Sequence, residues 1–463
     1  MPYDNQFASK SAHADFVRNP DVQTFLEACD YLTPPSEEEA ERMAAHYQEP
    51  PDIEDVRLPK FVLAIDGSFH ETSRDDRLPS TKFGFVKVGA VLFGLEEFSS
   101  LRQGRFVDPF RVARLKEQNT ALTFVLPSAN IRLKGKSNVR DSFRAALDRQ
   151  FMGESTRFEP ANFHSSLRST LFHLAHLRPG DMGSEDPFHL KIHKCPVCGK
   201  GPLTLEDIEE QQYCEYCGAE VYPTDVLRIW EEVHDYQSNI TAISRLMMIL
   251  EHLIPIHYMR YIEKKALFTL SEMAFFIDGP LAIFGNAAWL HRAIMIYLYK
   301  LNSKLQRKNK RPMLMIGLQK SGQVVDHVQL LDRFLPRNVL FAIDDDYRYT
   351  HIYANRSPSG QGFGFETYYG QNFIFKTPSG RTFVFALPYP FASKEPPGKD
   401  FGKEKVRWEN YPQLANAIKL IEHLESDLYK NAVVPIALAH RYTAISLQPG
   451  GRVLDLLTKK VVQ

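Results

Sequence analysis

The stretch FVLAIDGSFHE, residues 61–71, decides the fold, because an apolar run leads directly into Asp66 and Gly67. Short apolar runs that end at a glycine are typical of strands buried on both faces, and a carboxylate at the end of such a strand emerges at the edge of the sheet. Asp-Gly is also a common dipeptide in plain turns. Residues 61–71 alone therefore leave two interpretations open, a turn and a functional site.

A second stretch, MAFFIDGPLAIFG at 273–285, repeats the pattern and ends its apolar run at Asp278. Two such strand ends favour carboxylates that meet at one site, so Asp66 and Asp278 are predicted to form a pair. Close carboxylates repel each other unless one is protonated or a cation lies between them. Carboxylate oxygens suit magnesium or manganese, and such ions activate water for phosphodiester cleavage. The pair therefore predicts a metal-dependent phosphodiesterase centre.

Length and composition indicate a globular protein. The 463 residues are enough for one large elaborated domain or two to three domains, and 44% of them are hydrophobic. The 56 basic and 56 acidic residues cancel, which argues against a uniformly positive DNA-binding surface. Local basic stretches remain at 132–140 and at 300–311, the latter with Lys308 and Arg311, and each is either a DNA contact or a solvated helix end.

The sequence shows no uncharged apolar run of about 18 residues or more, which a membrane-spanning helix requires. Its first residues, MPYDNQFASKSAHADF, lack the basic start and apolar centre of a secretory signal. We therefore expect a soluble, cytoplasmic protein without a membrane span.

Four of the five cysteines form two matched pairs, Cys195 with Cys198 and Cys214 with Cys217. Each pair has two residues between its cysteines and is followed by a glycine, which is the spacing of a zinc ribbon. A redox dithiol needs only one pair, so this pattern favours metal. Four thiolates leave no position for water, which predicts a structural zinc site. Cys29 remains as an ordinary thiol.

The pattern along the chain predicts an α/β protein in four segments. Residues 1–55 form an acidic helical leader, 56–190 the first half of the core, 191–222 an inserted zinc ribbon and 223–463 the second half. A strand is expected at 82–95, and a long amphipathic helix at 240–268 precedes the second acidic strand.

The order of IDGS, IDGPL, GLQKSG and PIALAHR resembles that of the NurA nuclease family, over roughly residues 58–105 and 240–450. The resemblance implies a ribonuclease-H-like mixed sheet flanked by helices and a manganese- or magnesium-dependent deoxyribonuclease. It also implies DNA end processing, in repair or phage defence, with a HerA-like hexameric ATPase translocase. A homodimer is expected as well.

The resemblance also implies roles for individual residues. Asp66 and Asp278 match the family's strand ligands for metal, and Glu251 matches a glutamate on the helix before the second strand. The three acids would hold one or two manganese ions. An acid among apolar neighbours is costly unless it binds something, although a solvent-facing helix charge and the alternative Glu263 stay open. His440 matches a late histidine that ligates metal or assists proton transfer. Lys320 either contacts a phosphate or is a solvated loop lysine.

Two features depart from this pattern or stay open. The tyrosine that often precedes the late histidine is missing, and Tyr429 is the nearest substitute. The triplet at 344–346 is an accessory cation site or a charged turn, and the turn is favoured.

Two other functions remain to be separated from the nuclease. One is a catalytically inactive adaptor of the same fold that binds the translocase or DNA, consistent with the missing tyrosine. The other is a zinc protein that binds nucleic acid without chemistry, for which few basic residues flank the cysteines. The two intact aspartates favour the nuclease.

Overall fold

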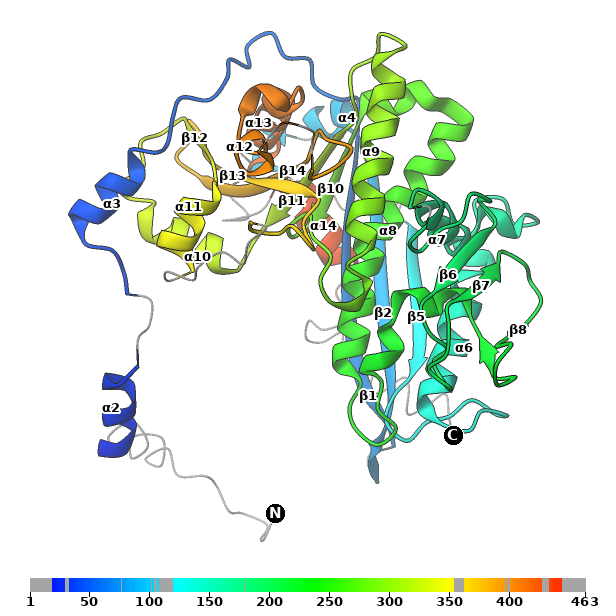
Figure 1. The fold of residues 1–463 in the computed structure, drawn as a ribbon. Coiled ribbons are helices and arrows are strands. Elements are labelled where there is room, and N and C mark those ends of the chain that lie inside the picture. Colours follow the sequence, from blue (N-terminus) through cyan, green and yellow to red (C-terminus); the bar gives the residue numbers. More distant parts are fainter. Residues whose placement is uncertain are drawn as a thin grey trace.

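The computed structural model describes residues 19–29, 33–75, 77–100, 102–103, 106–107, 120–178, 180–353, 362–395, 398, 400–426 and 433–443. Its centre is an eight-stranded sheet in the order β12-β13-β14-β11-β10-β1-β2-β5 (Figure 1). The strands are β1 Phe61–Asp75, β2 Leu78–Gly94, β5 Thr120–Pro127, β10 Met273–Asp278, β11 Leu314–Gln319, β12 Val339–Ala342, β13 Gly370–Lys376 and β14 Thr382–Pro388.

The sheet is mixed. β1, β10 and β11 run parallel to one another, whereas β2 pairs antiparallel with both β1 and β5. On the other side, β14 pairs antiparallel with β11 and β13, and β13 with β12. The predicted ribonuclease-H-like α/β class, a mixed sheet flanked by helices, is confirmed. The strands expected around 61–66, 82–95 and 273–278 are present as β1, β2 and β10.

Helices cover both faces of the sheet (Figure 1). One face carries α6 Val139–Phe151, α7 Leu167–His176, α8 Ile240–Ala266, α9 Leu290–Gln306 and α10 Gln323–Leu331; the other carries α13 Leu414–Leu424 and α14 Val434–Thr443. The shorter helices are α2 Pro20–Glu27, α3 Glu37–Ala44, α4 Leu95–Ser100, α11 Asp345–Tyr347 and α12 Phe401–Glu404. Two-stranded ribbons are β3 Arg102–Gln103 with β4 Phe106–Val107, β6 His189–Ile192 with β7 Leu203–Glu206, and β8 Gln212–Tyr213 with β9 Glu220–Val221.

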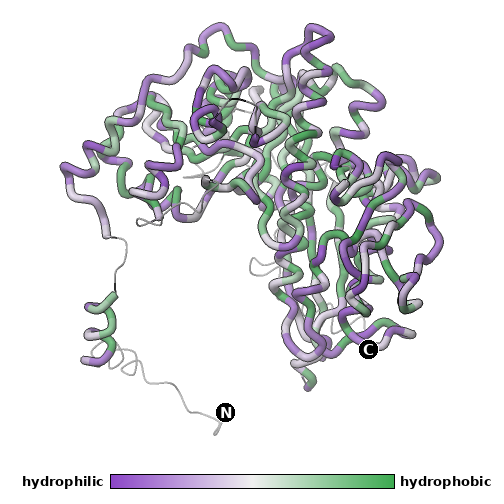
Figure 2. The backbone as a smooth tube through the Cα atoms, in the orientation of Figure 1, coloured by the Kyte–Doolittle hydropathy of each residue, from purple (hydrophilic) through white to green (hydrophobic). Residues whose placement is uncertain are grey.

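Strand β1 is buried on both faces, as its apolar run predicts. Leu63 and Ile65 belong to the hydrophobic cluster that contains α8, while Val62 and Ala64 belong to the cluster that contains α13 and α14. Hydrophobic residues gather along the strands at the centre of the molecule (Figure 2). Because successive side chains of a strand point to opposite faces, this alternation assigns Asp66 to the α14 face.

The segment from α8 to Glu272 is long and apolar enough to cross a membrane by length and composition. However, 67% of its apolar window is buried within the protein. This burial is typical of the core helix of a globular protein. The predicted cytoplasmic location stays a prediction.

The described part of the predicted leader contains the two helices α2 and α3. Ala40 and Met43 of α3 are buried against α10 in a third hydrophobic cluster. Gln48 then exchanges two backbone hydrogen bonds with Leu340 on the edge strand β12. The leader is therefore attached to the sheet from α3 onward. The four predicted domain boundaries stay predictions.

Glycine at position 89 lets α14 lie directly on β2. A Cβ atom there would lie 2.6 Å from Thr443 Cγ2 and 2.9 Å from Tyr442 Cδ1. Contacts of that length force neighbouring groups to shift. Since α14 carries His440, Gly89 also helps to determine where this histidine sits.

We predict that Gly89→Ala lowers the free energy of unfolding by about 1–3 kcal/mol, because the added methyl group overpacks the contact with α14. Gly94→Ala, on the same strand, is the control, because a Cβ there would meet only Glu97 Cβ at 3.9 Å. The control should change the unfolding free energy by about 0.5 kcal/mol or less. Urea unfolding measures both variants, and equal effects would contradict the close packing of α14.

Candidate metal and catalytic site

Asp66 and Asp278 lie side by side, where β10 ends and β1 continues. The pairing of these parallel strands runs from Phe61 opposite Met273 to Ile65 opposite Ile277, and the two aspartates come next on each strand. One oxygen from each carboxyl group and a ring nitrogen of His440 all lie within 4.8 Å of one another. The structure thus brings together three residues that the sequence analysis assigned to a metal site.

Glu251 reaches the same place from α8, on the opposite face of the sheet from α14. Since β1 extends past the end of β10, the backbone N–H of Gly67 is available, and it donates to Glu251 Oε1 at 2.8 Å. A Cβ at position 67 would lie 2.7 Å from Met247 Cγ and 2.9 Å from Glu251 Oε1. Glycine at this position therefore admits the glutamate to the end of the sheet.

Two of the three carboxyl groups of this site are buried, and all three repel one another. Asp66 is 2% exposed and Glu251 is 7% exposed. Burial, together with the charge of Asp278, raises the pKa of Asp66 to about 6, although Lys320 and His440 oppose the rise. Burial, and then the charges of Asp66 and Asp278, raise the pKa of Glu251 well above its ordinary value. The close negative charges therefore destabilise the metal-free site, and a bound cation would relieve this repulsion.

His440 and Thr443 approach Asp66 from one turn of α14. The Nδ1 atom of His440 lies 2.8 Å from Asp66 Oδ2, and Thr443 Oγ1 lies 3.5 Å from the same oxygen. The side chain of His440 is 46% exposed, whereas that of Asp66 is 3% exposed. The imidazole thus connects a buried carboxylate to solvent.

Lys320 faces the other aspartate. It follows β11, whose pairing with β10 ends at Leu318 opposite Asp278, and its Nζ lies 2.6 Å from Asp278 Oδ2. Both side chains are partly exposed. The ammonium group offsets part of the negative charge and lies at the open side of the site.

The donor set fits a hard divalent cation. Magnesium and manganese prefer carboxylate oxygens, and an imidazole nitrogen is an additional ligand that manganese accepts. Asp66, Asp278 and His440 supply such atoms, and the raised pKa values of Asp66 and Glu251 follow from repulsion that a bound cation relieves. These residues are therefore able to hold a metal.

Two predicted DNA contacts lie elsewhere. Arg311 donates to the backbone carbonyls of Arg57 and Ser271 and pairs with Glu272 at 3.3 Å, next to the start of β10. Lys308 follows the end of α9. The structure does not bring these two residues together with the aspartates. The guanidinium of Arg311 is already engaged in contacts within its own chain. Their contact with DNA stays a prediction.

Contacts in the structure also decide between the alternatives that the sequence left open for the α8 acid and for the triplet at 344–346. Glu263 accepts hydrogen bonds from Tyr297 and Lys304 at 3.1 and 2.9 Å, so Glu251 is the acid of α8 that reaches the site. Asp344 accepts the backbone N–H of Tyr347 at 2.7 Å and caps α11, as expected of a turn. Tyr429 lies outside the described residues.

Two contributors were not predicted from the sequence. The sequence around Gly67 predicts only a turn, whereas its role depends on the approach of α8. Thr443 lies three residues after His440, and this helical spacing places both side chains on one face. In a helix over 434–443, that spacing indicates that the two side chains lie together.

The four paired cysteines also converge. Their sulfur atoms all lie within 4.8 Å of one another, and the Cys195–Cys217 and Cys198–Cys214 distances are each 3.8 Å. Tetrahedral zinc with Zn–S bonds of about 2.3 Å places sulfurs roughly 3.8 Å apart. Gly199 and Gly218, with φ of 72° and 70°, close the two turns. The cluster fits a metal with four thiolate ligands.

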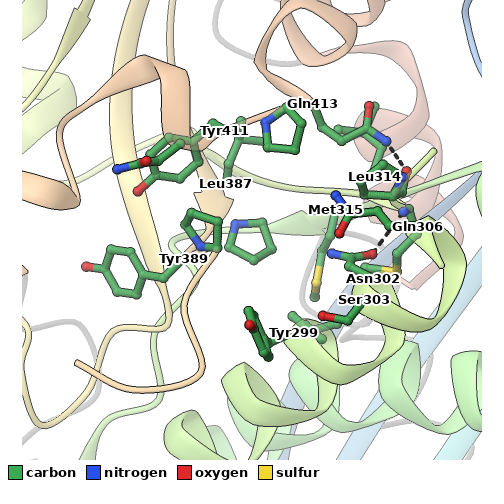
Figure 3. Close-up of a pocket in the computed structure, with 17 residues that line it drawn as sticks. Tyr299, Asn302, Ser303, Gln306, Leu314, Met315, Leu387, Tyr389, Tyr411 and Gln413 are labelled. Carbon is green, nitrogen blue, oxygen red and sulfur yellow. Dashed lines mark hydrogen bonds between the residues drawn. The ribbon is translucent and has the colours of Figure 1, made fainter. Parts of the chain in front are cut away.

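A separate cavity of ≈ 210 Å³ lies between α9 and the first residues of β11 (Figure 3). Its lining includes Tyr299, Asn302, Met315 and Tyr411. Lys320 follows the other end of β11, and the length of an extended strand places it roughly 16 Å from Met315. This cavity is therefore not part of the acidic site.

Comparison with known proteins gives a family. A family model described as the NurA domain matches residues 61–445. The chain belongs to the NurA family. A solved structure described as "Crystal structure of NurA" is 12% identical to this chain and has a TM-score of 0.27. The alignment covers 98% of this chain and 99% of the chain in that structure. A comparison with curated proteins found no match.

NurA membership makes the chain a member of a nuclease family. The NurA match begins at Phe61, the first residue of β1, so the predicted leader lies before it. The matched range includes Asp66, Glu251, Asp278 and His440. The acidic site therefore lies within the NurA domain.

We predict that stabilisation by manganese weakens as the pH falls through about 6, where Asp66 takes up a proton that a metal must displace. The raised pKa sets the sign: the metal-free folded state keeps this proton when the unfolded chain has lost it, so acidification stabilises the metal-free protein. The measurement is the rise in melting temperature that Mn²⁺ causes in chelator-treated protein, at about pH 7.5 and about pH 5.

Asp66→Asn is the control for this titration. Its manganese-induced rise should be small and similar at both pH values. An equal, large rise in the parental protein at both pH values would contradict the assignment of Asp66 as a ligand.

Proposed function

We propose that this chain is a deoxyribonuclease that hydrolyses phosphodiester bonds with Mn²⁺, or Mg²⁺, at the site around Asp66 and Asp278. The observation that carries the proposal is the convergence of Asp66, Asp278 and His440 within 4.8 Å in a chain of a nuclease family. DNA as the substrate fits that family.

Asp66, Asp278 and His440 would hold the cation, with Glu251 beside them. When bound, the cation supplies Lewis-acid stabilisation of the phosphate and makes a water molecule a better nucleophile. The protein groups position the reactants. Lys320 can turn from Asp278 to a phosphate oxygen and donate charge-assisted hydrogen bonds.

Glu251 is the remaining group that can handle a proton. Its pKa is raised well above its ordinary value, so it can hold a proton at its carboxyl group inside the site. Asp66 orients the His440 ring through Nδ1, so that the imidazole can serve the cation as a ligand.

We further propose that a HerA-like hexameric ATPase delivers the DNA, in end processing for repair or phage defence. The equal numbers of acidic and basic residues support dependence on a partner, because they give little general affinity for DNA. α2 has no buried residue, and its Phe25 and Leu26 are 67% and 52% exposed, which suits an apolar helix face that docks in a partner's groove. The homodimer remains part of this proposal.

An inactive adaptor would use the same fold without cleaving DNA. The burial of Asp66 and Glu251 favours the nuclease, because uncompensated buried acids destabilise a protein that has no use for them. The next prediction separates these two functions.

We predict that Glu251→Gln reduces manganese-dependent degradation of linear DNA by roughly a hundred-fold or more, because it removes an ionisable group from the site. Glu263→Gln is the matched control on the same helix, because its carboxylate contacts Tyr297 and Lys304 instead. Release of acid-soluble nucleotides measures both variants. Parental activity in Glu251→Gln would refute the assignment, and an inactive parental protein would favour the adaptor.

We propose zinc as the metal of the cysteine cluster. Four thiolates hold zinc more tightly than oxygen ligands hold manganese, and a closed tetrahedral shell supports folding. We predict about one zinc per chain after a mild chelator has removed nuclease activity, which manganese alone restores.

Elemental analysis and activity assays test this separation. Cys217→Ser should lower the melting temperature with little change in cleavage by the folded fraction. The absence of zinc, or a loss of cleavage in folded Cys217→Ser as complete as in Glu251→Gln, would show that the cluster belongs to the catalytic site.

A further inference from the structure

Helix α8 lies along β1 and β2 (Figure 1) and carries Glu251 to the acidic site. From Asn239, which precedes the helix, to Glu251 the helix is roughly 18 Å long. At the Glu251 end, the N–H of Gly67 holds the carboxylate at 2.8 Å. One hydrogen bond at one point does not fix the direction of a helix, so the position of Glu251 also depends on what holds the start of α8.

Glu71 of β1 holds that start. Its side chain is 3% exposed. Its Oε1 accepts the backbone N–H of Asn239 at 2.9 Å, and its Oε2 accepts the hydroxyl of Ser238. Ser128, which follows β5, and Lys82 of β2 donate to the same carboxylate. One buried side chain thus connects β1, β2 and β5 to the start of α8.

The donors keep Glu71 charged. Burial acts to raise the pKa of Glu71, but the hydrogen bonds from its donors outweigh burial, and the pKa is lowered. Hydrogen bonds to a charged acceptor are stronger than those to a neutral one. The carboxylate of Glu71 is therefore a strong anchor for the backbone of Asn239.

A glycine opposite Glu71 lets the helix approach at this point. Glu71 pairs with Gly84 across β1 and β2, and a Cβ atom at position 84 would lie 2.3 Å from Ile243 Cδ1, in the first turn of α8. The other end of the contact has the same arrangement, because Gly67 admits Glu251. Each end thus combines a glycine with a hydrogen bond between a carboxylate and a backbone N–H.

We propose that Glu71 is a positioning residue of the acidic site, which fixes the start of α8 on β1 and thereby sets where Glu251 meets Asp66. Glu71 follows Asp66 on β1 by roughly 16 Å at the rise of a strand, so it acts through the helix and not on the reacting groups. For its effect on cleavage, this inference rests on the proposed nuclease function.

Exchange of the Gly67 amide hydrogen reports the position of Glu251 without any cleavage. The sequence contains two Asp-Gly pairs, at 66–67 and 278–279. Labelling with ¹³C-carbonyl aspartate and ¹⁵N-glycine therefore gives separate NMR signals for Gly67 and Gly279 in the chelator-treated full chain. Gly279 donates to the carbonyl of Leu318 at 2.8 Å and is the internal control.

Glu71→Gln keeps the size of the side chain but leaves one acceptor oxygen in place of two. We expect it to speed exchange of the Gly67 amide at least about five-fold, the effect of losing one net hydrogen bond, with Gly279 unchanged. Ser238→Ala removes one donor at an exposed residue and should act in the same direction, by about two-fold or more. Lys82→Met removes a donor that lies on β2 and is the matched control, with exchange at the parental rate.

Cleavage of linear DNA at saturating Mn²⁺ gives the second readout. Glu71→Gln should lower kcat about ten-fold and change KM less than about two-fold, because a misplaced group at the site affects the transition state more than DNA binding. Lys82→Met should keep the parental kcat.

The outcomes separate positioning from a merely structural role. Unchanged Gly67 exchange or parental kcat in Glu71→Gln, equal acceleration at Gly67 and Gly279, or an equal loss in Lys82→Met would each overturn the proposal. If Glu71→Gln does not fold, Ser238→Ala decides by the same criteria. If the parental protein does not cleave DNA, the nuclease function fails, and Gly67 exchange still decides whether Glu71 positions Glu251.

Discussion

The repulsion between Asp66 and Asp278 is the constraint on which the site depends. Two parallel strands hold the carboxylates next to each other, and burial raises the pKa of Asp66 to about 6. The fold supplies partial compensation through Lys320, which contacts Asp278, and through His440, which contacts Asp66. A third acid, Glu251, increases the negative charge. This balance favours binding of a divalent cation, which offsets the repulsion between Asp66 and Asp278.

These charged side chains can meet because glycines in the strands let the helices approach closely. Gly67 leaves room for Glu251 of α8 on one face, and Gly89 leaves room for Thr443 of α14 on the other. The unequal lengths of β1 and β10 matter as well, since the N–H of Gly67 lies beyond the paired region and bonds the glutamate. Helices from both faces therefore meet at a single strand end.

Local patterns predicted much of this arrangement. The apolar runs before Asp66 and Asp278 predicted buried strands, and the spacing of the four cysteines predicted their cluster. Other features depend on contacts between distant segments. The neighbouring positions of β1 and β10, the approach of α14, and the placement of Arg311 at the far end of β10 follow from tertiary packing.

The most direct test of the account is the position of manganese in the folded protein. Crystals treated with a chelator and then soaked in Mn²⁺ would be measured by anomalous diffraction at the manganese absorption edge. The account predicts a manganese peak among Asp66, Asp278 and His440, with Lys320 displaced from Asp278. A site without manganese at saturating Mn²⁺, with the Lys320–Asp278 contact intact, would contradict it.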